Sequence, residues 1–180
     1  MPKKLKEKQT PVTRKFLNDL ARSIYNPTTR RFLRLCKGTL QNGPDPTDKK
    51  RSMHCGLGEL YFAMTGLQPE ETGIDEDGVV AMAVARSPLQ SADELRQIAA
   101  EGVKKLKLPK GVKETMLEAL DEMDGDYLAE DAEDFKSTLD DIPGQNDSCG
   151  DSHACTTEDF RTRSQRVAAK LREAAKILPV

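Results

Sequence analysis

Apolar residues return every three or four positions along much of the chain, which is the period of an α-helix. Five stretches follow this period: residues 10–24, 55–65, 91–106, 112–123 and 157–178. Residues that stop helices, Asn26-Pro27 and Gly66 among them, lie where the pattern breaks. The pattern therefore predicts a mostly α fold, a compact single-domain helical bundle.

Capping residues mark two of the expected helix starts. Ser91 and Glu94 have the spacing of a capping box, in which the serine side chain and the glutamate side chain each bond a backbone amide at the other's position. Thr157 can cap the closing helix. In the helix over 112–123, the apolar side chains expected to face inward are Met116, Leu117 and Leu120.

Three segments are harder to interpret. Residues 28–37 favour a short helix that Gly38 ends, which with the helix before it gives the outline of a helix-turn-helix. The apolar run Val79–Arg86 follows a turn at Asp75–Gly78 and fits either a buried helix or a buried strand. A small β-hairpin near 73–85 is compatible with the second choice. Residues 41–53 are expected to form a loop.

The 180 residues are 37% hydrophobic and 32% charged, which suits one domain with one modest core. Residues 1–9 form a charged segment with a proline, and we expect a disordered basic tail there. Residues 10–180 then make a single helical domain that contains an acidic segment at 114–159. No run of about 18 apolar residues occurs, so no membrane contact is expected.

Charge is segregated along the chain although the net charge is only −2. Residues 1–57 carry 14 Lys and Arg against 4 Asp and Glu; residues 58–160 carry 8 against 25; residues 161–180 carry 6 against 1. The basic ends either pair with the acidic middle or face an acidic partner such as nucleic acid. We favour the first, because the opposite charge is already in the chain.

Residues 114–159 hold 16 acidic side chains and one basic one, Lys136. An acidic helical face of this kind is usually a solvated surface, but it can also mimic nucleic-acid phosphates and bind a basic channel. A calcium loop at Asp121–Asp126 is excluded, because Leu120 would occupy its first ligand position. The residues predicted to contact a partner are Asp121, Glu122, Asp124, Asp126, Glu130, Asp131, Glu133 and Asp134.

The start of the helix near residue 55 is a candidate ligand site. His54, Cys55, Gly56 and Gly58 lie together there, and the amides at a helix N-terminus favour an anion or a thiolate. One hypothesis makes Cys55 a nucleophile with a histidine as base. The other makes the cysteine and the glycines a tight packing joint, which we favour.

A polar stretch near the C-terminus is a candidate zinc site. Cys149, His153 and Cys155 supply three nitrogen or sulfur ligands, and Cys36, His54 or Cys55 could supply the fourth. The spacing is not that of a common zinc finger, so a flexible insert is the alternative.

Two stretches, Cys36–Leu60 and Ile142 onward, resemble a diffuse group of small proteins from phages, prophages and actinobacteria. The positions that match its pattern are Gly38, Pro44, Cys55, Leu57, Gly58, Leu60, Asn146 and Asp147. His54 and the insert Cys149–Asp159 depart from that pattern. The resemblance implies a small phage-type accessory protein of a bacterial host, and a meeting of Asn146 and Asp147 with the helix start at Cys55. The basic N-terminus has no apolar stretch after it and is not a secretory signal, so a cytoplasmic location is expected.

No P-loop, dinucleotide-binding, metalloprotease or serine-hydrolase motif is present, so we do not expect an enzyme. The expected function is binding of a macromolecular partner, a host defence or replication factor, through the acidic face and without a cofactor. Nucleic-acid binding by the basic N-terminal half and the closing helix is an alternative, although that helix lacks interleaved aromatic residues. A small zinc-binding or ligand-binding protein is the third hypothesis.

Overall fold

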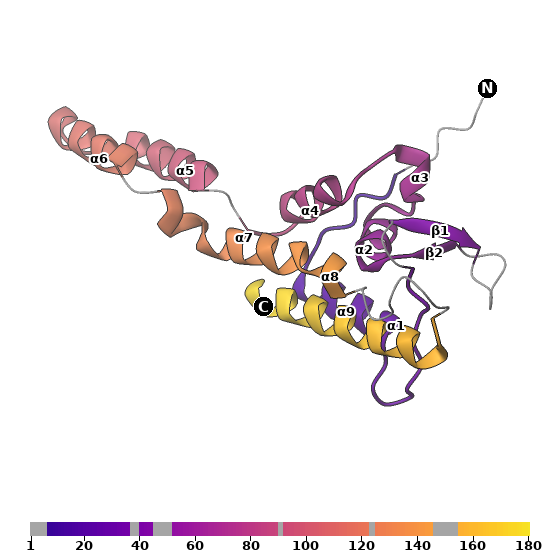
Figure 1. The fold of residues 1–180 in the computed structure, drawn as a ribbon. Helices are drawn as coiled ribbons and strands as arrows, with labels where there is room; N and C mark the ends of the chain where they lie inside the picture. The colour runs from indigo at the N-terminus through magenta and orange to yellow at the C-terminus, as the bar shows by residue number, and fades with distance from the viewer. Residues whose placement is uncertain (1–6, 37–39, 45–51, 90–91, 123–124, 146–154) are drawn as a thin grey trace, which may run out of the picture. The chain divides into compact units, whose positions relative to one another are not determined.

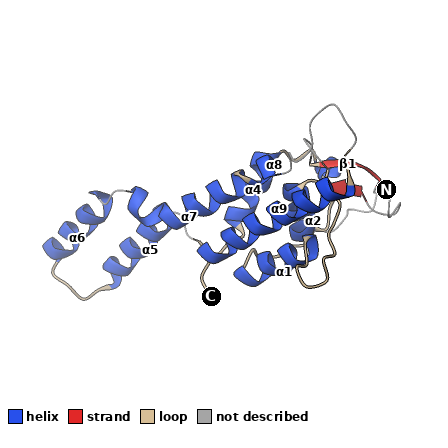
Figure 2. Ribbon diagram, turned by 60° about the horizontal axis from the view of Figure 1, so that its bottom comes forward, coloured by secondary structure: helices blue, strands red, loops and turns tan. Residues whose placement is uncertain are grey.

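The computed structural model describes residues 7–36, 40–44, 52–89, 92–122, 125–145 and 155–180 (Figure 1). Its elements in chain order are α1 (Arg14–Ile24), β1 (Gln41–Pro44), β2 (Ser52–His54), α2 (Gly56–Thr65), α3 (Pro69–Thr72), α4 (Glu76–Ala85), α5 (Ala92–Lys105), α6 (Lys110–Glu122), α7 (Gly125–Asp140), α8 (Ile142–Gln145) and α9 (Thr157–Ile177). The fold is mostly helical, as the periodicity predicts (Figure 2).

The chain gathers into two compact units. Unit 1 comprises Met1–Pro88 and Phe135–Val180, and unit 2 comprises Leu89–Asp134. Of the described residues in unit 2, only Val103 is buried, whereas unit 1 holds the rest of the buried core. The single domain expected from the sequence stays a prediction.

The centre of unit 1 is the pair α1 and α9, which lie side by side although they come from opposite ends of the chain (Figures 1 and 2). Leu17, Leu20 and Ile24 of α1 are buried, as are Val167 and Leu171 of α9. Burial of these aliphatic side chains is the main force that holds the two helices together.

Side chains of α1 and α9 also satisfy backbone groups at helix ends. The guanidinium of Arg14 in α1 donates to the carbonyls of Ala175 (3.0 Å), Lys176 (2.8 Å) and Leu178 (2.9 Å) at the end of α9. These carbonyls have no partner within the helix, and a cation is favoured at this end of the helix dipole. At the other end the cap is Thr156, in a capping box with Asp159, one residue before the expected Thr157.

Helix α2 packs against α4 and α8 within unit 1. It ends at Gly66 as predicted, with the glycine in the left-handed conformation (φ 72°). The ambiguous run at 79–86 is helical: Asp75 caps α4 by accepting from the amide of Gly78 at 2.8 Å. The expected turn at Asp75–Gly78 is therefore the first turn of α4, and the hairpin considered near 73–85 is wrong.

The β-hairpin lies instead in the segment expected to be a loop. β1 and β2 are antiparallel, pairing Gln41 with His54, Asn42 with Met53 and Pro44 with Ser52, with a register shift between 42 and 44. This segment has no clear alternation of apolar residues, so the sequence carries no strand signal. Backbone bonds from Cys55 to Leu40 (3.2 Å) and from Cys36 to His54 (3.0 Å) continue the pairing.

The helix predicted over 28–37 is absent from the described residues 28–36, and with it the helix-turn-helix outline. Residues 27–29 form a turn, and Tyr25 and Phe32 face each other in an isolated antiparallel bridge. The amide of Leu33 donates to the carbonyl of Ile24 (2.9 Å). The chain therefore folds back along the end of α1 and satisfies its backbone groups there.

In unit 2, α5 and α6 form a helical pair joined at residues 106–109, close to the predicted break. The capping box expected at Ser91 lies outside the described residues. No residue of α6 is buried: Met116 is 37% exposed, and Leu117 and Leu120 are half-buried. The expectation that these three side chains face inward is therefore wrong for Met116 and only partly met for the other two.

The end of the predicted basic tail and the residue after it bond to the end of α2, within unit 1. The amide of Lys8 donates to the carbonyl of Thr65 (2.8 Å), and the amide of Thr10 donates to the carbonyl of Met64 (3.3 Å). Among the described residues, none of the helices has the length and apolar character needed to span a bilayer.

Candidate functional site

Cys55 is the N-cap of α2, and its sulfur accepts from the amide of Gly58 at 3.3 Å. The side chain is buried. Burial raises the pKa of this thiol to about 12, against the opposing effect of the Gly58 amide bond. At neutral pH Cys55 is therefore a protonated thiol, which is a poor nucleophile and a poor metal ligand.

His54 is equally buried, and both of its ring nitrogens have partners. Nδ1 lies 3.2 Å from Oε1 of Glu59, and Nε2 lies 2.6 Å from Oε1 of Gln68. The imidazole therefore joins β2, α2 and the start of α3 in a polar cluster. With both nitrogens engaged in this way, His54 is not placed as a base for Cys55.

The two glycines of this segment let the backbone approach its neighbours closely. A Cβ at Gly58 would lie 2.0 Å from the carbonyl oxygen of Leu40, and one at Gly56 would lie 2.6 Å from Ile142 and 2.7 Å from Val167. The structure thus brings together His54, Cys55, Gly56 and Gly58, and it does so as a closed packing joint.

Asn146 and Asp147, expected to meet this joint, lie outside the described residues, as do Cys149 and His153. Cys155 is described: its sulfur is disulfide-bonded and accepts from Nη2 of Arg163 at 3.4 Å. Within the described ranges, no cluster of three or more His, Cys, Asp and Glu side chains is arranged to hold a metal ion. A sulfur held in a disulfide is not a thiolate, so Cys155 in this structure is not a zinc ligand. The zinc site as a whole stays a prediction, because Cys149 and His153 lie outside the described residues.

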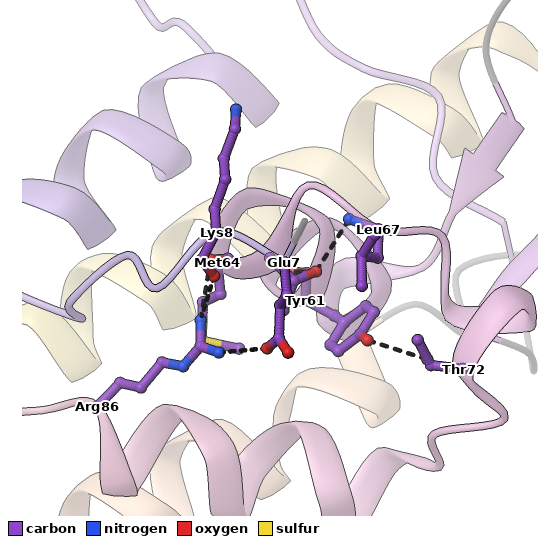
Figure 3. A network of polar contacts seen from close by, with 8 residues as sticks. Glu7, Lys8, Tyr61, Met64, Leu67, Thr72 and Arg86 are labelled. Atoms are coloured by element: carbon purple, nitrogen blue, oxygen red, sulfur yellow. Dashed lines mark hydrogen bonds and ion pairs between the residues drawn. The ribbon is translucent and has the colours of Figure 1, made fainter. Parts of the chain in front are cut away.

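A polar network that the sequence did not reveal lies at the end of α2 (Figure 3). Arg86, the C-cap of α4, donates to the carbonyls of Met64 (2.9 Å) and Lys8 (3.2 Å) and pairs with Glu7 (2.6 Å). The hydroxyl of Tyr61 donates to Thr72 at 2.9 Å. Arg86 thereby connects α4, the end of α2 and the N-terminal segment, so its role in this structure is to hold these three segments together.

The residues predicted to contact a partner lie in unit 2. Of these eight residues, Asp124 and the side chain of Asp126 fall outside the described part of the chain. The other six side chains are exposed, and none of them forms an ion pair with another described residue. We call them the unit 2 carboxylates: Asp121, Glu122, Glu130, Asp131, Glu133 and Asp134.

Unit 2 also contains an apolar groove that sequence reasoning missed. It has a volume of about 430 Å³ and lies between α5 and α6, lined by Ala99, Val103, Met116, Ala119 and Leu120. Ile98 (56% exposed) of α5 and Val112 (46%) of α6 leave further apolar surface on the same two helices, and Leu106 (45%) is exposed directly after α5. The sequence signal for this groove was the number of apolar side chains in two short helices that are also highly charged.

No protein-family model, curated protein or solved structure matches this chain.

Proposed function

We propose that this chain is a non-enzymatic accessory protein that binds a protein partner through unit 2. The observation that carries the proposal is the α5–α6 groove, which is apolar along its walls and lies on helices rich in exposed carboxylates. The partner contributes an amphipathic segment, apolar on one face and basic on its edges.

The apolar half of the proposal rests on exposure. Monomeric proteins rarely leave contiguous apolar surface open on short helices, because covering it with another apolar surface is favourable by about 25 cal/mol per Å². The side chain of Met116 in the groove is flexible and polarisable, as in surfaces that accept varied apolar partners.

The charged half rests on the same unit. Unit 2 carries 13 Asp and Glu against 6 Lys and Arg, and none of its basic residues lies beyond Lys113. On α6, Glu118 lies between groove residues and Asp121 and Glu122 follow them, and all three are exposed. A basic partner gains attraction from these charges and reduces their mutual repulsion.

A protein that binds nucleic acid has a basic surface of this kind. The unit 2 carboxylates would then stand in for phosphates, in keeping with the phage-type accessory role that the resemblance implies. Host defence and replication factors are the partner classes in which such surfaces are common.

The test uses a fluorescent synthetic amphipathic helix of leucine and lysine as the probe, titrated with the full chain and followed by anisotropy. We expect saturable binding with one site per chain, weakened by salt because exposed charges are screened. Met116→Glu, which places a charge in the groove, should weaken binding by about tenfold or more, equivalent to about 1.4 kcal/mol.

Val180→Glu is the matched control, because it places the same charge on an exposed apolar residue of unit 1. It should bind the probe as the parent protein does. The proposal fails if the probe does not bind, or if both variants lose the same affinity.

A further inference from the structure

Unit 1 has a basic pocket at the turn that follows α1. It has a volume of about 480 Å³, and we call it the arginine pocket after its lining residues Ser23, Arg30, Arg31, Phe32 and Leu33. No carboxylate of the described residues lines it. Arg30 and Arg31 are exposed, and Phe32 is half-buried, so the pocket offers two cations and part of an aromatic ring.

The turn holds these side chains in a defined arrangement. The side-chain oxygen of Asn26 accepts from the amides of Thr28 (3.0 Å) and Thr29 (3.2 Å), and the amide of Asn26 donates to the carbonyl of Arg31 (2.9 Å). Arg30 has φ 57°, in the left-handed region that strains the backbone of a non-glycine residue. Arg30 therefore adopts a backbone conformation in which glycine would be less strained.

Arginine side chains lie over two aromatic rings, Phe32 in the pocket and Phe160 of α9. The guanidinium of Arg161 lies 5.7 Å from the ring centre of Phe32. Those of Arg34 and Arg163 lie 5.2 and 5.5 Å from the ring centre of Phe160. Two carboxylates of α9 lie close by: Glu158 pairs with Arg161 at 2.7 Å, and Asp159 accepts from the amide and the hydroxyl of Thr156.

From this arrangement we infer that the arginine pocket binds single-stranded nucleic acid. Arg30 and Arg31 pair with phosphates, and Phe32 offers a face on which a base stacks. The closing helix lacks interleaved aromatic residues in its sequence. In the folded chain, however, Arg161 of this helix lies over Phe32, which comes from a distant part of the chain. A duplex fits less well, since residues 28–36 contain no helix to enter its major groove.

This inference is independent of the proposed function, which concerns unit 2. Unit 1 carries 22 Lys and Arg against 17 Asp and Glu, so its net charge favours a polyanion, whereas that of unit 2 opposes one.

The experiment titrates a fluorescent oligothymidine with the full chain at several salt concentrations. Binding should be saturable, and log K should fall linearly with log salt. Replacing both Arg30 and Arg31 with alanine removes two phosphate contacts, so the slope should decrease by about 1.4, at about 0.7 per phosphate of a single strand. An abasic strand of equal length separates base stacking from charge, and Phe32→Leu should weaken binding of oligothymidine but not of the abasic strand.

Two further variants keep the result interpretable. Arg30→Gly suits the left-handed backbone, so it should retain the fold by circular dichroism while it weakens binding. The double variant Lys104→Ala with Lys105→Ala removes the same charge from exposed positions of unit 2 and should leave binding unchanged. The inference is overturned if oligothymidine does not bind at low salt, if the lysine variant loses as much affinity as the arginine variant, or if Phe32→Leu weakens both strands equally.

Discussion

At the scale of single residues, Cys55 shows how one side chain can hold a helix start without being reactive. Its sulfur caps α2 through the Gly58 amide, and its burial raises the pKa of the thiol to about 12. The helix N-terminus favours a thiolate, yet the cost of placing a charge among buried groups is larger.

The raised pKa has a consequence for stability against pH. Because the thiol ionises near 9.0 in the unfolded chain and near 12 in the folded one, its contribution to stability is complete below pH 9 and declines as the pH rises toward 12. Cys55→Ser keeps a capping oxygen but does not titrate in this range. Urea unfolding of the two proteins across this range should show a smaller loss of unfolding free energy for the serine variant, and parallel losses would contradict the assignment.

Among the described glycines, Gly58 leaves the least room for an added Cβ. Gly58→Ala would place a Cβ 2.0 Å from a backbone oxygen that cannot move away easily, so we expect a loss of about 3 kcal/mol in unfolding free energy. Gly144→Ala, in α8 of the same unit, has nothing within 4 Å of the new Cβ and should change stability by less than about 1 kcal/mol. Equal effects of the two substitutions in chemical denaturation would show that the close approach at Gly58 is unimportant.

At the scale of elements, α9 organises the segment that returns along α1. Arg163 is fully buried and donates through Nη1 to the carbonyl of Leu35, and the hydroxyl of Ser164 donates to the carbonyl of Leu33. These two side chains on successive positions of α9 satisfy backbone groups of an irregular segment, which needs such partners because it has no ladder of its own.

Arg163→Ala should therefore destabilise the protein by about 3 kcal/mol, since it leaves a buried carbonyl without its charged donor and removes a large side chain from the core. Arg166→Ala, on the exposed side of the same helix, should change stability by no more than about 0.5 kcal/mol. Thermal and urea unfolding of both variants measure the difference. If Arg163→Ala is as stable as Arg166→Ala, the buried hydrogen bond does not stabilise the fold.

At the scale of the whole molecule, the two units differ in both charge and core. Unit 1 has a net positive charge and a continuous aliphatic core, whereas unit 2 has a net negative charge and one buried residue, Val103, among those described. The contrast in sequence between basic ends and acidic middle thus becomes a contrast between units. Ion pairs such as Lys170–Asp141 (3.1 Å) neutralise charge within unit 1.

This contrast predicts a difference in local stability. Amide hydrogens of α5 and α6 should exchange at least about tenfold faster than those of α1 and α9, because few buried contacts oppose their opening. Hydrogen exchange of the full chain, read by mass spectrometry, tests this. Equal protection of the two helix pairs would mean that the α5–α6 groove is covered in solution, which would also weaken the proposed function.

Much of the helical content was predictable because its signals are local. The periodic apolar residues of α1, α2, α6 and α9 and the stop at Gly66 depend only on neighbouring positions, and the helices lie close to the predicted ranges. The cluster of His54, Cys55, Gly56 and Gly58 was also predictable, since these residues lie close together in the sequence. The small size of the cysteine and the two glycines favoured a packing joint, and the close contacts at Gly56 and Gly58 agree with that expectation.

Other features of the fold depend on contacts between residues far apart in the chain. Residues 79–85 lie in a helix that packs against α2, and residues 41–44 and 52–54 form strands that pair with each other. The conformation of such short segments depends on the elements that they contact. Met116 remained exposed because nothing among the described residues covers it, which periodicity does not reveal. Phe32 and Arg161 met because the chain returns along α1 and α9, and no local pattern encodes a contact across so many residues.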